Sequence, residues 1–119
     1  MNILIVESSP DLGALWQAHL RRGGARVDLA ATADQAELLV QEHGYDVVII
    51  DILLSEGSAL AIADLVGFRW PEAKVILVTR AGFFSDGSIF NLGINVRAMI
   101  SHEVPLDDLA AVVEYHGRA

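Results

Sequence analysis

The stretch Asp46-Val47-Val48-Ile49-Ile50-Asp51 decides the fold of this chain. Four consecutive branched apolar residues between two acids are typical of a strand that is buried on both faces, as in parallel sheets. A second stretch of the same kind, Ile3-Leu4-Ile5-Val6-Glu7, also ends in an acid. Because the carboxyl ends of parallel strands meet at one edge of a sheet, we expect Glu7 and Asp51 to converge there. Acids gathered at this edge indicate a site for a cation or for a transferable phosphoryl group.

Strand and helix signals alternate along the chain, without a repeat, a low-complexity segment or a linker. Right-handed crossovers between apolar strands predict a parallel sheet that helices cover on both faces, which is a doubly wound three-layer α/β sandwich. In the segment 81–95, glycines interrupt the helix pattern, so the fourth of five expected helices has the weakest signal. The expected strands are residues 2–6, 26–30, 46–51, 74–79 and 98–100.

Local signals predict where the first two helices begin. Ser9 followed by Pro10 is typical of an N-cap and a first helical position. Thr32 with Gln35 forms the pattern of a capping box. The i, i+3, i+4 spacing then predicts the buried face of the first helix. Its residues are Leu12, Leu15, Trp16, His19 and Leu20.

Size and composition narrow the class of protein. With 119 residues, of which 53% are hydrophobic and 20% charged, the chain is expected to form one domain over residues 1–119. A formal charge of −8 argues against direct nucleic-acid binding, because the phosphate backbone would be repelled. No apolar run approaches the roughly 20 residues of a membrane helix. The chain also has no Cys, which fits a reducing compartment. From these two observations we expect a cytoplasmic protein without a membrane segment.

The ordered set of motifs resembles the receiver domains of bacterial two-component response regulators, over essentially the whole chain. The resemblance implies a CheY-like, flavodoxin-like (βα)5 sandwich with five parallel strands in the order 2-1-3-4-5. Each motif alone is weak, but their order and spacing together are specific. The motifs that carry the resemblance are residues 2–12, 45–52, 56–60, 75–79 and 98–109.

The resemblance implies a signalling module that acts by phosphoryl transfer and is not a conventional enzyme. In such domains an aspartate accepts a phosphoryl group from a sensor histidine kinase or a phosphotransfer protein, with Mg²⁺ bridging. Carried over by position, Asp51 is the phosphoacceptor and Thr79 is the hydroxyl that binds a phosphoryl oxygen. Glu7 and the backbone carbonyl of Leu53 join Asp51 as metal ligands. A divalent cation is needed because negative charge crowds the reacting oxygens.

Two departures from the family pattern fall inside the site. Ser8 stands where the family has a second acid that anchors the metal, so we expect weak Mg²⁺ binding. His102 aligns with the lysine that pairs with the phosphoryl group. The only lysine of the chain, Lys74, begins its strand at the opposite end. An imidazole is cationic only when protonated, whereas lysine is charged throughout the neutral range.

Further departures concern the output side, and they leave two functions open. Met99 replaces the aromatic switch residue, Arg80 replaces a small residue after Thr79, and Ser55 replaces the proline of the loop after the acceptor. The chain is therefore expected to be an atypical receiver that accepts a phosphoryl group. The alternative is a pseudo-receiver that binds partners independently of phosphorylation. A homodimer through the face from the fourth strand to the last helix is a further hypothesis, suggested by Phe83, Phe84 and Phe90.

Overall fold

The computed structural model describes residues 1–79 and 95–118 as alternating strands and helices. The fourth expected helix, Arg80 and the three phenylalanines of the predicted dimer surface lie outside the described residues. None of the described helices is long and apolar enough to cross a membrane. In chain order the elements are β1 (Asn2–Val6), α1 (Pro10–Arg22), β2 (Arg26–Ala30), α2 (Ala33–Glu42), β3 (Val47–Asp51), α3 (Ala59–Arg69), β4 (Lys74–Thr79), β5 (Val96–Ser101) and α4 (Leu106–Arg118).

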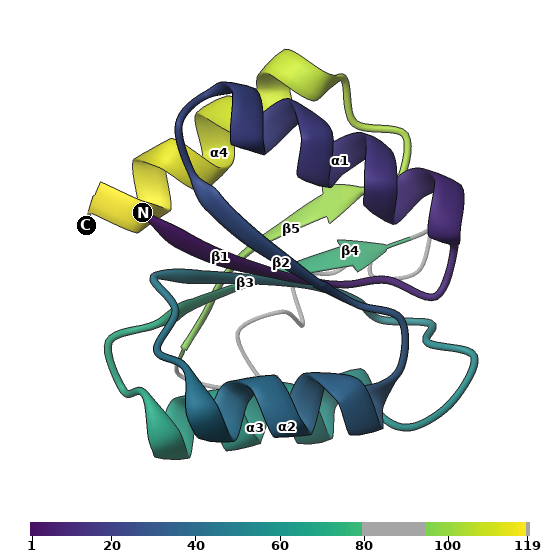
Figure 1. The fold of residues 1–119 in the computed structure, drawn as a ribbon, viewed down its shortest axis with the longest axis vertical. Helices are drawn as coiled ribbons and strands as arrows, with labels where there is room; N and C mark the ends of the chain where they lie inside the picture. The colour runs from purple at the N-terminus through teal and green to yellow at the C-terminus, as the bar shows by residue number, and fades with distance from the viewer. Residues whose placement is uncertain (80–94, 119) are drawn as a thin grey trace.

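The strands form one five-stranded sheet in the order β2-β1-β3-β4-β5, and each neighbouring pair is parallel. Figure 1 shows α1 and α4 on one face of this sheet and α2 and α3 on the other. The predicted three-layer α/β sandwich and its strand order are confirmed. Strand order reverses between β1 and β3, which puts the carboxyl ends of these two strands beside the crevice where ligands bind in such folds.

The core consists of two apolar layers, one on each face of the sheet. Because side chains alternate along a strand, β1, β3 and β4 contribute to both layers and are apolar at successive positions. Facing α2 and α3 are Leu4, Val6, Val48, Ile50, Val75 and Leu77. Facing α1 and α4 are Ile3, Ile5, Val47, Ile49, Ile76 and Val78.

Side-chain hydrogen bonds cap the N-termini of α2 and α3. The Thr32 hydroxyl accepts a hydrogen bond from the Gln35 N–H at 3.2 Å. The Gln35 side chain reaches back to the N–H of Ala31 at 2.8 Å, one residue before the position that a capping box predicts. Ser58 caps α3 in the same way by accepting from the Ala61 N–H. These bonds satisfy N–H groups that have no partner inside the helix.

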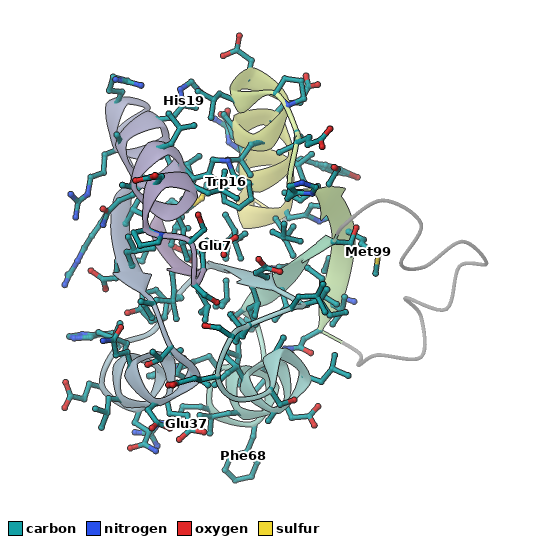
Figure 2. The ribbon with its side chains drawn as sticks, turned by 90° about the vertical axis from the view of Figure 1, so that its right-hand side faces the viewer. Glu7, Trp16, His19, Glu37, Phe68 and Met99 are labelled. Carbon is teal, nitrogen blue, oxygen red and sulfur yellow. The ribbon has the colours of Figure 1, made fainter. Side chains whose placement is uncertain are left out.

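The buried face of α1 differs in part from the predicted one. Trp16 and Leu20 are buried as expected, and Trp16 lies between α1 and α4 in Figure 2. Leu15, by contrast, is 48% exposed. A Cβ built on Gly13 would lie 2.9 Å from Cδ1 of Leu29, so this glycine allows α1 to lie close to β2. The buried stripe consists of Gly13, Trp16 and Leu20. At about 100° per residue, Leu15 falls outside that stripe.

Candidate functional site

Glu7 and Asp51 lie at the carboxyl ends of the adjacent strands β1 and β3. Val6 pairs with Ile50, and the two acids follow one residue later. Adjacent strands are about 4.8 Å apart, and the alternation along each strand directs both carboxylates toward the α1–α4 face. Each residue is only 2% exposed. Figure 2 looks onto this edge of the sheet, with Glu7 near the middle of the view.

Each of the two carboxylates is held by a backbone N–H two residues further along. The Ser9 N–H donates to Oε2 of Glu7 at 3.0 Å, and the Leu53 N–H donates to Oδ1 of Asp51 at 2.9 Å. Such local bonds are typical of turns that follow an acid. Ser9 occupies the N-cap of α1 as predicted, yet its hydroxyl makes no cap bond with the described residues. Its backbone instead helps to orient Glu7.

Ser8 joins the turn after β1 to the loop after β3. Its hydroxyl oxygen accepts a hydrogen bond from the Ser55 N–H at 3.0 Å. The sequence predicted Ser8 as the residue that weakens metal binding, and gave no sign of this contact. No local sequence pattern around a serine predicts a hydrogen-bond partner 47 residues away. The bond forms because the fold places the two loops side by side.

Thr79 and His102 lie at the carboxyl ends of β4 and β5, which follow β3 in the sheet on the side away from β1. The Thr79 hydroxyl donates to the Ile100 carbonyl at 3.4 Å. The backbone N–H of His102 donates to the Thr79 carbonyl at 2.9 Å, and Nδ1 of His102 lies 3.4 Å from the same oxygen. Nε2 of His102 lies 3.5 Å from a carboxylate oxygen of Glu103. The ring therefore has an acidic neighbour on its own loop.

Gly57 shapes the loop that follows the acceptor strand. Its φ of 86° lies in the left-handed region, which disfavours residues with a side chain. A Cβ at this position would collide with the side chain of Ala33, the first residue of α2. The loop thus passes directly over the start of α2. Residues 56–60 were matched to the receiver-family loop after the acceptor strand, and that resemblance did not indicate this close contact.

The oxygen atoms at this edge of the sheet form only part of a metal site. Two carboxylates and backbone carbonyls are oxygen ligands of the kind that Mg²⁺ prefers. Among residues 1–79 and 95–118, however, no group of three or more acidic or histidine side chains converges on a point that could hold a metal.

Comparison with known proteins identifies the class. The family model of the response regulator receiver domain matches residues 3–114, so this chain belongs to the response regulator receiver domain family. Receiver domains are modules of two-component signalling rather than conventional enzymes, and they generally bind a divalent metal. The chain is 27% identical over 118 residues to the transcriptional regulatory protein DltR of Streptococcus agalactiae. That match covers 99% of this chain and 52% of DltR, so the chain spans about half the length of this relative.

Solved structures share the fold at low sequence identity. A response regulator receiver domain protein (CheY-like) from Methanospirillum hungatei has a TM-score of 0.87 and 24% identity, with 98% of this chain and 93% of that chain covered. A response regulator from Burkholderia pseudomallei, with a phosphorylated aspartic acid, a calcium ion and citrate, has a TM-score of 0.83 and 17% identity. That likeness covers 98% of this chain and 68% of the other. Identities this low establish the fold alone.

Proposed function

We propose that this chain accepts a phosphoryl group on Asp51 from the phosphohistidine of a sensor histidine kinase or a phosphotransfer protein. The observation that carries the proposal is the burial of Asp51 beside Glu7 at the carboxyl ends of β3 and β1. Burying a charged side chain costs free energy, so an acid that only interacts with solvent beside a loop is expected to be exposed. The burial of Asp51 therefore favours a functional role. Membership in the receiver family supports the same role.

In the proposed reaction a carboxylate oxygen of Asp51 forms a bond to phosphorus while the nitrogen–phosphorus bond of the donor breaks. The donor histidine keeps the electron pair and takes up a proton from water, and Asp51 becomes an acyl phosphate. The Leu53 N–H, 2.9 Å from Oδ1, orients the acceptor carboxylate. In the proposed complex the Thr79 hydroxyl would turn from the Ile100 carbonyl to donate to a phosphoryl oxygen, and His102 would supply an N–H donor from the end of β5.

We propose Glu7, Asp51 and the backbone carbonyl of Leu53 as the ligands of a weakly held Mg²⁺. When bound, the cation would neutralise the negative charge shared by the carboxylates and the phosphoryl oxygens. Ser8 adds a neutral hydroxyl where a third acid would add charge. We therefore describe the chain as an atypical receiver, and place it in the cytoplasm together with its phosphohistidine donor.

The proposal is tested by incubating the protein with Mg²⁺ and phosphoramidate and then measuring its intact mass. The wild type should gain the mass of one phosphoryl group, and Asp51→Asn should gain none. Asp64→Asn is the matched control, because Asp64 is an exposed acid on α3. It should be phosphorylated like the wild type. An unchanged mass of the wild type at saturating donor would reject phosphoryl transfer to this chain.

A second candidate is a pseudo-receiver that binds partners independently of phosphorylation. Three contacts favour it, because the Ser8 hydroxyl holds Ser55, the Thr79 hydroxyl bonds to a β5 carbonyl, and His102 lies beside Glu103. Beryllofluoride, a phosphoryl mimic, would then leave the fluorescence of the two tryptophans unchanged. An Asp51→Ala protein would still bind its partner. A fluorescence shift that Asp51→Ala abolishes would favour the phosphoryl-accepting function instead.

A homodimer through β4, β5 and α4 remains part of the proposal. Met99 of the edge strand β5 is half-buried and packs in part against the α2–α3 core layer, at the outer side of β5 in Figure 2. An edge strand with such a side chain offers a surface for pairing with another chain. Sedimentation velocity with and without beryllofluoride tests the idea. A strictly monomeric protein in both states would remove the dimer from the proposal.

A further inference from the structure

An open cavity of about 460 Å³ lies between α1 and α4, at the opposite end of the sheet from Asp51. Ile3 at the start of β1, Leu20 near the end of α1 and Val113 in α4 belong to its lining. In Figure 1, this side of the molecule is where the N- and C-termini are marked, next to the last turns of α4. The cavity is therefore separate from the site at the carboxyl edge.

The floor of this cavity is apolar, and residues 1–79 and 95–118 leave the space above it unfilled. Ile3, Leu20 and Val113 are buried members of the α1–α4 core layer. The turn after α1 contributes Gly23 and Gly24, which have no side chains to enter the space. A Cβ built on Gly24 would meet nothing within 4 Å. The volume falls in the range of about 300–1,000 Å³ that is usual for small-molecule sites.

The rim of the cavity carries two arginines, in a chain with a formal charge of −8. Arg22 and Arg118 line it, together with one acid, Glu114. Glu114 is paired with Arg118 one helical turn away. His19, also on the rim, lies 3.6 Å from Asp107. No described residue forms an ion pair with Arg22, so its guanidinium is the rim cation that an incoming anion would meet.

The ends of two helices reduce the positive charge that the arginines bring to this rim. The last turns of α1 and α4 both reach the cavity, and each helix end carries roughly half a negative charge. The guanidinium groups of Arg22 and Arg118 offset these dipoles. With Glu114 opposing one arginine, the side-chain charges and the two helix ends sum to about zero, so the rim has no large net charge. Arg22 is the rim arginine without an ion pair among the described residues, and a single anionic group is the charge that it can pair with.

We propose that this cavity binds a small organic anion, with an apolar body against Ile3, Leu20 and Val113 and a single carboxylate or sulfonate group at Arg22. The volume and the short apolar floor favour a small molecule over a protein partner, whose interface would need a much wider surface. The inference is independent of phosphorylation at Asp51. It adds a second binding site, at the other pole of the domain.

The probe for this site is anilinonaphthalene sulfonate, an aromatic anion whose fluorescence rises in apolar surroundings. Phenylnaphthylamine, which has similar rings and no charge, reports on the apolar floor alone. Arg22→Gln should weaken binding of the sulfonate about fivefold and leave the neutral probe unaffected. Arg26→Gln is its control, because Arg26 is exposed and does not line the cavity. This control should bind both probes like the wild type.

A second pair of variants tests the floor. Ala110 lines the cavity, whereas its neighbour Ala111 is exposed and does not. Ala110→Phe should abolish binding of both probes, and Ala111→Phe should change neither. Equal behaviour of the two phenylalanine variants, or an equal loss of both probes in Arg22→Gln, would overturn the proposal. So would a dimer in sedimentation equilibrium that Ala110→Phe disperses, because a second copy would then occupy the cavity. Arg22 is exposed, so its variant keeps the test valid even where Ala110→Phe unfolds.

Discussion

The hydroxyl oxygen of Ser8 accepts a hydrogen bond from the Ser55 N–H at 3.0 Å and so links the two loops that border Asp51. The resemblance to receiver domains assigns this position to a metal-binding acid. Here a neutral hydroxyl ties the turn after β1 to the loop after β3. The bond needs no cation, so the two loops are held together in the absence of metal.

Ser8→Ala should loosen the loop after β3. Removing the acceptor leaves the Ser55 N–H to water, so hydrogen exchange at this amide should become faster. Because the bond is exposed, the free energy of unfolding should fall by only about 0.5 kcal/mol. Ser9→Ala is the control, since the Ser9 hydroxyl makes no cap bond with the described residues. Unchanged exchange at Ser55 would show that the bond does not hold the loop in solution.

Ser8→Asp should raise the affinity of the site for Mg²⁺. A third carboxylate beside Glu7 and Asp51 adds a negative charge and an oxygen ligand, and we expect about a tenfold gain, or roughly 1.4 kcal/mol. Isothermal titration calorimetry measures the affinity. Ala111→Asp adds the same charge at an exposed position on α4 and should produce no gain. Equal affinities for the wild type and Ser8→Asp would argue against a metal site at this edge.

His102→Lys should speed phosphorylation of Asp51 by a small donor at pH 7. A lysine ammonium is always charged there, whereas an imidazole is charged only when protonated. We expect a rate increase of about tenfold, measured as the growth of the phosphorylated mass over time. The control is His43→Lys at the far end of α2, which should react like the wild type. Should both variants react equally fast, net charge rather than position would explain the gain.

Gly57→Ala should destabilise the domain more than Gly24→Ala. Both glycines have positive φ, at 86° and 98°, so both substitutions carry a backbone penalty of about 1 kcal/mol. Only at Gly57 does the new Cβ also collide with Ala33. We expect a total loss of about 2–4 kcal/mol there, measured by urea denaturation. Equal losses at the two positions would mean that the loop shifts away from α2 at little cost.

Tyr45→Phe should lower the free energy of unfolding at neutral pH. It should also make that free energy fall less steeply as the pH rises above about 10. Burial, and then the hydrogen bond to Asp28 at 2.7 Å, raise the pKa of the Tyr45 phenol above its usual value. The unfolded chain releases this proton near pH 10, while the folded one retains it, so stability falls as the pH rises above about 10. The variant loses about 1 kcal/mol at pH 7 and lacks this component of the decline.

Urea denaturation of both proteins at pH 7 and near pH 10.5 measures the difference. Tyr115→Phe, at an exposed position on α4, should have little effect at either pH. If Tyr45→Phe and the wild type lost the same stability between the two pH values, the Tyr45 phenol would not be held in its protonated form.

Much of the fold could be predicted because its signals are local. The unbroken apolar residues of β3 indicate a strand buried on both faces, and Thr32 with Gln35 marks the start of α2. The prediction for α1 was wrong at Leu15, because the contact between Gly13 and Leu29 sets the rotation of the helix. A helical repeat specifies which residues share a face. It does not specify how that face is turned toward its neighbours.

By itself, the sequence determined the alternation of strands and helices and the position of an acid at the end of β1 and of β3. These features depend on the order of residues along the chain. Only the tertiary structure decided that Glu7 and Asp51 are both buried, that Ser8 holds Ser55, and that an open cavity lies between the last turns of α1 and α4. The physical reason is that hydrogen bonds and packing act through space. Residues far apart along the chain become neighbours only when the sheet orders its strands.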